Sequence, residues 1–252
     1  MNQQSQAVAS ATKVAIVTGA SRGIGRAVAL RLARDGFAVT VNYLGHVVQA
    51  NETVAAIEAS GGKAIAVQGD TGNPQDVAHL FDVTQETFGR LDVVVNSAGI
   101  MPMAIIAEAN LDAFDRVIAT NLRGTFLVFA QAAQHLGRGG RIIALSTSVI
   151  ARPLPGYGPY IASKAGVEGL VRVLASELRG RGITVNAIAP GPVATELFLS
   201  GKSEEQVAQI ARQSPMERIG QPDEIAQAVS FLAGPDGAWV NAQVVRVNGG
   251  FA

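Results

Sequence analysis

Residues 14–25 read VAIVTGASRGIG, and this stretch decides the fold of the 252-residue chain. A short apolar run is followed by a glycine-rich turn and then by the amphipathic helix sequence RAVALRLARDG, which ends at Gly36. Gly19, Gly23 and Gly25 allow a tight turn and let the backbone approach a pyrophosphate, whose charge is favoured by the helix N-terminus. The stretch therefore predicts the strand, phosphate-binding turn and helix with which dinucleotide-binding domains begin.

The same alternation of strand and helix continues along the chain and predicts the fold class. Further strands are expected at residues 38–43, 63–70, 91–99, 140–148, 183–190 and 243–249, and helices at 47–60, 74–88, 121–135, 160–178 and near 222–232. About seven alternating strands favour a single α/β domain, a Rossmann-like doubly wound parallel sheet covered on both faces. We expect residues 13–252 to form this dinucleotide-binding catalytic domain and residues 1–12 to be a disordered segment.

The composition excludes several classes of function. Hydrophobic residues make up 48% of the chain and charged residues 16%, which suits a thick core. The 20 basic and 20 acidic residues cancel, so no nucleic-acid partner is expected. There is no cysteine, and His46, His79 and His135 are too scattered to predict a metal site. Because neither a signal peptide nor a long apolar run is visible, we predict a cytoplasmic protein without a membrane partner.

Residues 191–215, GPVATELFLSGKSEEQVAQIARQSP, interrupt the alternation directly after a predicted strand. Connections of this length in compact domains are usually functional, and ligands of open α/β sheets bind beyond the carboxyl ends of the strands. We interpret the segment as a lid over a ligand site. The alternative is a surface insertion with short helices.

Tyr160 and Lys164 stand four residues apart at the start of a helical run, so their side chains share one face. A phenol is a poor acid or base at neutral pH, but a neighbouring cation favours the phenolate and lowers the phenol's pKa. Tyr160 could then exchange a proton with a substrate oxygen. For an isolated pair, a half-buried tyrosine and a solvated lysine would be the simpler interpretation.

Further motifs follow in order and remove that ambiguity. They are TGASRGIG at 18–25, NSAG at 96–99, Asn121, the serine-rich strand end at 146–148, YIASK at 160–164, and Pro190 with Gly191. From about Lys13 onward the chain resembles the short-chain dehydrogenase/reductase family, in the form similar to 3-oxoacyl-carrier-protein reductases. The resemblance implies hydride transfer between a nicotinamide cofactor and a carbonyl or alcohol.

The resemblance also implies a role for each matching residue. Tyr160 would be the general acid in reduction and the base in oxidation, while Lys164 would lower its pKa and hold the nicotinamide ribose. Asn121 would anchor a water that carries protons to solvent. Asp70 matches an adenine-contacting aspartate, although a turn or helix-capping role is the alternative. The full set of expected cofactor contacts is Gly19, Ser21, Arg22, Gly23, Ile24, Gly25, Asn42, Tyr43, Asp70, Thr71, Asn96, Ala98, Gly99, Tyr160, Lys164, Pro190, Gly191, Val193 and Thr195.

The chain departs from the family pattern at two places. NSAG replaces the family's NNAG, so Ser97 stands where an asparagine is usual. The family's catalytic serine falls on Thr147, which is flanked by Ser146 and Ser148. Either the Thr147 hydroxyl polarises the carbonyl or a one-residue slip presents Ser148. The proline- and glycine-rich loop that follows makes such a slip easy, so Ser148 is slightly favoured.

The expected cofactor is NADP(H). An acidic residue at the end of the second strand, roughly 20 residues beyond the glycine turn, selects NAD by repelling a 2′-phosphate. That position falls on Asn42 or Tyr43, and neither is acidic. Arg22 can add a charge-assisted hydrogen bond to the phosphate, or it can be an exposed turn residue.

The sequence thus predicts NADPH-dependent reduction of a ketone to a secondary alcohol. The alternatives are an NAD-dependent alcohol, polyol or sugar dehydrogenase and, with less support, a non-catalytic dinucleotide sensor. The expected pocket wall is mostly apolar and consists of Met101, Pro102, Met103, Ile150, Pro153, Leu154, Tyr157, Leu197 and Phe198, with Arg152 as the nearby charge. Surplus apolar residues on the helices at 121–134 and 160–178 could pack on a second copy, and the family resemblance implies a homotetramer. The physiological substrate and the stereochemistry stay open.

Overall fold

A computed structural model describes residues 12–252, and a parallel sheet of seven strands forms its centre. The strand order is β3-β2-β1-β4-β5-β6-β7, and every neighbouring pair is parallel. The strands are β1 (Val14–Thr18), β2 (Ala38–Tyr43), β3 (Ala64–Gln68), β4 (Val93–Asn96), β5 (Arg141–Leu145), β6 (Thr184–Pro190) and β7 (Val244–Val247). The predicted Rossmann-like doubly wound fold is confirmed.

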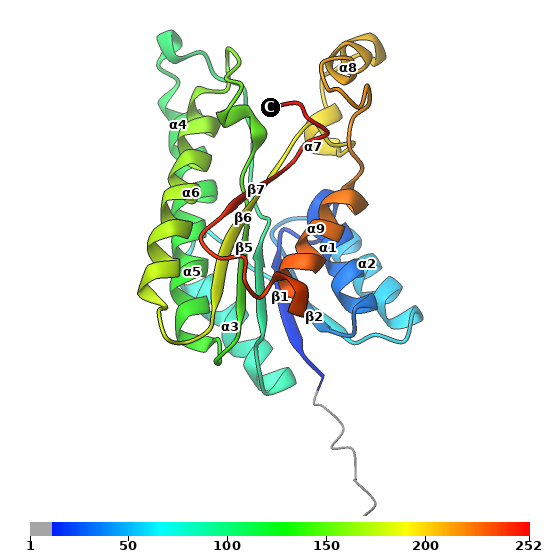
Figure 1. Cartoon of the computed structure of the whole chain (residues 1–252), viewed down its shortest axis with the longest axis vertical. Coiled ribbons are helices and arrows are strands. Elements are labelled where there is room, and N and C mark those ends of the chain that lie inside the picture. The colour runs from blue at the N-terminus through cyan, green and yellow to red at the C-terminus, as the bar shows by residue number, and fades with distance from the viewer. Residues whose placement is uncertain (1–11) are drawn as a thin grey trace, which may run out of the picture.

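Helices cover both faces of this sheet (Figure 1). One face carries α1 (Gly23–Arg34), α2 (Val47–Ala59) and α9 (Pro222–Ala233). The other carries α3 (Pro74–Phe88), α5 (Gly124–His135) and α6 (Gly158–Glu177). Shorter elements are α4 (Leu111–Val117), α7 (Glu196–Leu199), α8 (Glu204–Ala211), a π-helical turn at Ile118–Arg123 and 3₁₀ turns at Ile106–Glu108, Ser148–Ile150 and Pro235–Gly237.

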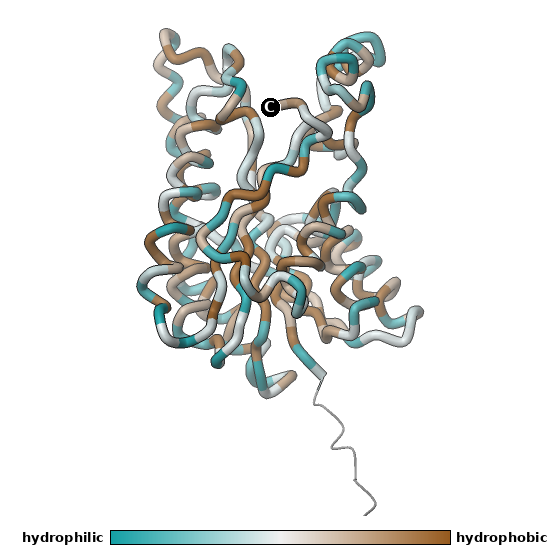
Figure 2. The backbone as a smooth tube through the Cα atoms, in the orientation of Figure 1, coloured by the Kyte–Doolittle hydropathy of each residue, from teal (hydrophilic) through white to brown (hydrophobic). Residues whose placement is uncertain are grey.

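Two apolar cores hold the layers together, one on each face of the sheet. Strands β1, β2, β4 and β6 are buried along their whole length, as expected when parallel strands are covered on both sides. The hydrophobic stretches of the backbone accordingly gather in the middle of the molecule (Figure 2). The sheet is therefore a rigid platform for the loops that leave its carboxyl edge.

The strand order reverses between β1 and β4, and this position determines where a ligand can bind. The loop after β1 leads to α1 on one face, whereas the chain after β4 leads toward the helices of the other face. Diverging loops leave a crevice at the carboxyl ends of the strands, the usual ligand site of open α/β sheets.

Three sequence-based expectations need comment. The helix expected at 121–135 begins differently, because Asn121 lies in the π-helical turn and regular α-helix starts only at Gly124. The interval 191–215 contains α7 and α8, and its function as a lid stays a prediction.

The disordered segment predicted at 1–12 lies outside the described residues except for Thr12, which is exposed. In the described part of the chain, no helix is long and apolar enough to cross a membrane.

Candidate functional site

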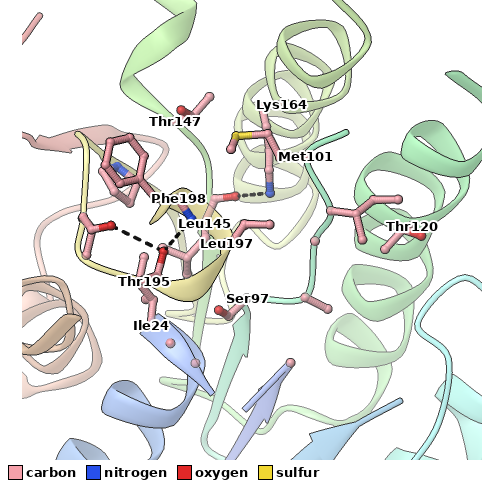
Figure 3. A pocket seen from close by; sticks show the side chains of 18 of the residues that line it. Ile24, Ser97, Met101, Thr120, Leu145, Thr147, Lys164, Thr195, Leu197 and Phe198 are labelled. Atoms are coloured by element: carbon pink, nitrogen blue, oxygen red, sulfur yellow. Dashed lines mark hydrogen bonds between the residues drawn. The ribbon is translucent and has the colours of Figure 1, made fainter. Parts of the chain in front are cut away.

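A cavity of about 500 Å³ opens at the carboxyl edge of the sheet, within the size range of small-molecule sites (Figure 3). The loops after β1, β2, β3, β4, β5 and β6 all contribute to its lining, together with the start of α6. Most of the residues predicted from the sequence line this one cavity. Of the predicted catalytic and cofactor-binding residues, Ser21, Tyr43, Asn96 and Asn121 do not line it.

The glycine turn has the geometry that a phosphate site requires. Gly19 and Gly23 adopt left-handed backbone angles, with φ of 62° and 56°. A Cβ at Gly25 would lie 2.3 Å from the Gly19 carbonyl oxygen, so no other residue fits there. Arg22, which precedes α1, places no side-chain cap on the first turn of the helix. The N–H groups of that turn are thus available to an anion.

The end of β2 is neutral, as predicted, and of its two predicted cofactor residues only Asn42 lines the cavity. Asn42 lines the cavity and braces the glycine turn, because its Oδ1 accepts from the Gly19 amide at 3.4 Å and its Nδ2 donates to the Gly69 carbonyl at 3.1 Å. Tyr43 is buried in the apolar core, so its predicted cofactor contact is not supported. Leu44 and His46, which sequence reasoning missed, line the cavity beyond the strand.

Arg22 lies at the mouth of the cavity and makes an ion pair with Glu196. The Nη1–Oε2 distance is 2.6 Å, and both side chains are largely exposed. Glu196 is the first residue of α7, so the pair joins the glycine turn to the interval 191–215. Only the three-dimensional structure reveals this partner, because the two residues are 174 positions apart.

Asp70 and Thr71 follow β3 and line the cavity. The Asp70 Oδ1 accepts a hydrogen bond of 2.8 Å from the Gly72 amide, as in a turn that an aspartate side chain stabilises. Asp70 can therefore both stabilise this turn and lie in a ligand site, as predicted.

Asn96 belongs to a buried hydrogen-bond chain behind the cavity. It accepts from the Thr18 hydroxyl at 2.8 Å and donates to the Thr125 hydroxyl at 2.7 Å, and Thr125 donates in turn to the Asn121 carbonyl. The predicted direct cofactor contact of Asn96 is not supported. The Thr18 hydroxyl that donates to Asn96 accepts from the Ala98 amide at 3.0 Å and so fixes the loop of Ala98 and Gly99, which does line the cavity.

Asn121 is buried and makes three hydrogen bonds through its side chain. Its Oδ1 accepts from the Ile100 amide at 2.9 Å, and its Nδ2 donates to the Ile100 carbonyl at 2.9 Å and the Ser163 hydroxyl at 3.1 Å. Ser163 donates to the Tyr160 carbonyl. Asn121 thus connects the loop after β4 to the first turns of α6, and its role in a water relay stays a prediction.

Tyr160 stands at the start of α6 and forms part of the cavity wall. Burial raises the pKa of its phenol to about 12, a hydrogen bond with Thr147 opposes that shift, and the neighbouring Tyr157 adds to it. The shift is opposite in sign to the one predicted from the Tyr160–Lys164 spacing. The hydroxyl is therefore a firmly protonated donor at neutral pH.

Lys164 is buried one turn further along α6. Its Nζ lies 6.0 Å from the centre of the Tyr160 ring and donates to the Leu145 carbonyl at 2.7 Å (Figure 3). Burial lowers the pKa of the Lys164 ammonium to about 8. Burial of the phenol, and not Lys164, therefore determines the direction of the Tyr160 shift.

The three hydroxyls after β5 point to different partners. Ser146 donates to Glu168 on α6 at 2.7 Å, and Ser148 donates to the Ala189 carbonyl at 2.9 Å. Ser148 also accepts from Asn248 at 2.9 Å and is only 1% exposed. Thr147 is the one that interacts with Tyr160, and it lowers the pKa of the Tyr160 phenol. The geometry therefore favours Thr147, contrary to the preference for Ser148, because Ser148 is used to hold β6 and the segment after β7.

The stretch after β6 passes over the glycine turn. Pro190, Gly191, Val193 and Thr195 line the cavity as predicted, and the Thr195 hydroxyl caps α7 by accepting from the Phe198 amide at 3.2 Å (Figure 3). A Cβ at Gly191 would lie 2.8 Å from the Asn248 side chain, so Gly191 lets these two loops cross.

The apolar wall differs in part from the expected one. Met101, Tyr157, Leu197 and Phe198 line the cavity, whereas Pro102, Met103, Ile150, Pro153 and Leu154 do not. Val149 and Phe251 also line it and were missed. Among residues 12–252, no cluster of three or more His, Cys, Asp or Glu side chains could hold a metal ion.

Comparison with known proteins gives concordant results. A family model described as enoyl-(acyl carrier protein) reductase matches residues 19–252. A short-chain type dehydrogenase/reductase of Picea abies is 46% identical, over 94% of this chain and 92% of the relative. An NADPH-dependent aldehyde reductase-like protein, chloroplastic, of Arabidopsis thaliana is 43% identical, over 96% and 94%. The crystal structure of a short-chain dehydrogenase from Burkholderia cenocepacia in complex with NADP superposes with a TM-score of 0.90 at 38% identity, over 95% and 97%.

Proposed function

The chain belongs to the short-chain dehydrogenase/reductase family, and from this premise we propose that it reduces a neutral, partly apolar ketone to a secondary alcohol with NADPH. The reaction is reversible, so the same site oxidises the alcohol with NADP⁺. One observation carries the proposal: Tyr160, Lys164 and Thr147 share a single cavity with the glycine turn and Arg22.

The cavity fits NADP(H) at its glycine-turn end. The uncapped first turn of α1 suits the pyrophosphate, and Arg22 offers a cation for the 2′-phosphate. Asn42 stands where an acidic residue would repel that phosphate. Both the Arabidopsis relative, by its name, and the Burkholderia structure point to the same cofactor. When bound, NADPH supplies the hydride that adds to the carbonyl carbon.

Thr147 and Tyr160 supply the proton and the hydrogen bonds to the carbonyl oxygen. Both residues line the same cavity, and their side chains interact, so one carbonyl oxygen placed between them can accept from both hydroxyls. As negative charge develops on that oxygen, Tyr160 transfers its proton and becomes phenolate. Lys164, directly behind the ring, stabilises the phenolate until a proton from solvent restores the phenol.

The assembly is proposed to be a homotetramer that uses the outer faces of α5 and α6. Phe126 on α5 and Val173 on α6 are each 57% exposed, and Ala165 and Gly169 leave a flat surface beside them. Val167 and Val171, by contrast, are buried against the sheet. An exposed apolar surface of this kind suits a contact with a second copy.

A panel of ketones, keto esters, aldehydes and 3-oxoacyl thioesters, followed by the loss of NADPH absorbance, tests the function. We expect turnover of at least one neutral ketone and a fall of about 10²- to 10⁴-fold in kcat for Tyr160→Phe. NADPH binding should change little in that variant, because only a hydroxyl is lost. Near-normal turnover by Tyr160→Phe would refute the assignment, and equal use of NADH would refute the cofactor preference.

A further inference from the structure

The five residues Asn248–Ala252, here called the post-β7 segment, turn back from the edge strand toward the cavity. Gly249 and Gly250 both adopt left-handed backbone angles, with φ of 60° and 83°. The Asn248 Oδ1 accepts from the Gly250 amide at 3.0 Å, and its backbone carbonyl accepts from the Phe251 amide at 3.0 Å. This tight reversal carries the Phe251 side chain into the cavity wall.

The post-β7 segment is fixed on two sides. Ser214 donates to the Gly249 carbonyl at 2.6 Å, and a Cβ at Gly250 would lie 2.8 Å from Pro215. On the other side, Asn248 donates to the Ser148 hydroxyl at 2.9 Å, next to Thr147. The segment therefore bridges the end of the 191–215 interval and the strand end that carries the proposed catalytic hydroxyl.

Phe251 itself is held by Arg152. The guanidinium carbon of Arg152 lies 4.7 Å from the centre of the Phe251 ring, a cation–π distance, and its Nη1 donates to the Phe251 carbonyl at 3.3 Å. Only 4% of Phe251 is exposed, although it lines the cavity. Arg152 does not line the cavity, so its charge serves the ring rather than a ligand.

We infer that Phe251 determines which ketones the enzyme accepts and that Arg152 is the positioning residue that holds its ring in place. This inference rests on the proposed function. Phe251 joins Met101, Tyr157, Leu197 and Phe198 in an apolar wall, whose size limit is set by a ring that cannot swing away. Because Arg152 is engaged by Phe251 and lies outside the cavity lining, it is not available to an anionic substrate. The substrate class is a neutral ketone of limited size.

The test uses two ketones of different size, acetophenone and 2-acetonaphthone, with purified full-length variants. For Phe251→Ala, the ratio of kcat/KM for 2-acetonaphthone to that for acetophenone should rise about tenfold or more, since single methylene-sized changes in an apolar pocket shift selectivity by about 10- to 200-fold. Arg152→Gln should raise the ratio less, by about threefold. Arg152→Lys, which keeps a cation, should restore part of the wild-type ratio.

Phe231→Ala, a phenylalanine on the outside of α9, is the matched control and should leave the ratio unchanged. The dissociation constant of NADPH, measured by fluorescence titration, should be the same in all variants. Phe251→Leu and thermal melting exclude misfolding as the cause. An unchanged ratio in folded Phe251→Ala and Phe251→Leu would overturn the inference, as would a change in NADPH affinity instead of the ratio.

A failure of the proposed function is distinguished from a failure of this inference by the activity of the wild type. The wild type would then bind NADPH and reduce neither ketone. In that case calorimetric titration of 2-acetonaphthone into the NADP⁺-saturated protein still decides the inference. Tighter binding to Phe251→Ala than to the wild type supports a size-limiting wall, and equal or absent binding overturns it.

Discussion

Thr147→Val and Ser148→Ala should affect different properties of the protein, turnover and stability, although the two residues are neighbours. Thr147 lines the cavity and interacts with Tyr160, whereas Ser148 is buried and bridges the Ala189 carbonyl and Asn248. Valine keeps the shape of threonine and deletes the hydroxyl. The first change should therefore reduce turnover, and the second should reduce stability.

The magnitudes follow from these contacts. Loss of one donor to the developing oxyanion reduces kcat by about 10²- to 10³-fold, which is the fall expected for Thr147→Val. Ser148→Ala removes two hydrogen bonds, one to the Ala189 carbonyl and one from the Asn248 amide, which keeps its bond of 2.8 Å to the Ala252 carbonyl; the loss should cost about 1–3 kcal/mol in the free energy of unfolding. For a domain of this size, that corresponds to a fall in Tm of about 2–10 °C. Its kcat should stay within about threefold of wild type.

The assay measures steady-state reduction of the best ketone and the thermal melting temperature of both variants. Thr147→Ser is the control, because it restores the hydroxyl and should recover most of the turnover. The reasoning fails if Ser148→Ala loses 10²-fold in kcat while Thr147→Val stays active. It also fails if both variants keep wild-type turnover, since no hydroxyl after β5 would then act on the substrate.

The remaining predictions concern the cofactor, pH and assembly. Arg22→Ala should weaken NADPH binding by about one decade and leave NADH binding unaffected, as measured by fluorescence titration. Equal losses of affinity for both cofactors would show that Arg22 does not contact the 2′-phosphate. Leu44 is 60% exposed and lines the cavity, so an aspartate there would repel a 2′-phosphate, and Leu44→Asp should shift the cofactor preference toward NADH. An unchanged NADPH/NADH ratio of kcat/KM would argue against a 2′-phosphate site at this position. As pH rises through about 8, Lys164 loses its charge and no longer stabilises the developing phenolate, so kcat/KM for reduction with NADPH should fall; a value that stays constant from pH 7 to 10 would contradict this role. Light scattering at micromolar concentration should give the mass of four chains, and Phe126→Glu should reduce it; a monomeric wild type would end the assembly proposal.

The fold was predictable because its signals are local and repeated. Apolar strands separated by amphipathic helices indicate a covered parallel sheet, and the strand boundaries observed lie within those expected. Glycines with no room for a Cβ, such as Gly25, mark the phosphate turn with equal clarity. The residues that gather in the cavity were therefore largely foreseeable from the order of the motifs.

The errors arose where the direction of a side chain decides its role. Ser148 and Thr147 are chemically equivalent in the sequence, and only the contacts with Ala189 and Tyr160 separate them. The i, i+4 spacing placed Lys164 beside Tyr160 correctly, yet it did not reveal that burial of the phenol raises its pKa. Phe251 was missed because no local pattern shows that two left-handed glycines turn it toward a distant arginine.

The strand order allows the sheet to grow outward as the chain is synthesised. Each of β2, β3, β5, β6 and β7 pairs with the strand immediately before it in the sequence, and β4 pairs with the free edge of β1. Every newly made strand thus meets an edge that already exists, and none has to be inserted between strands already joined. The glycine turn follows β1, the first strand of the chain, whereas Phe251 follows β7, the last strand. Pulse-labelling hydrogen exchange during refolding should accordingly protect the amides of β1, β2 and β4 before those of β7, so that the cofactor half of the cavity takes shape before the substrate half.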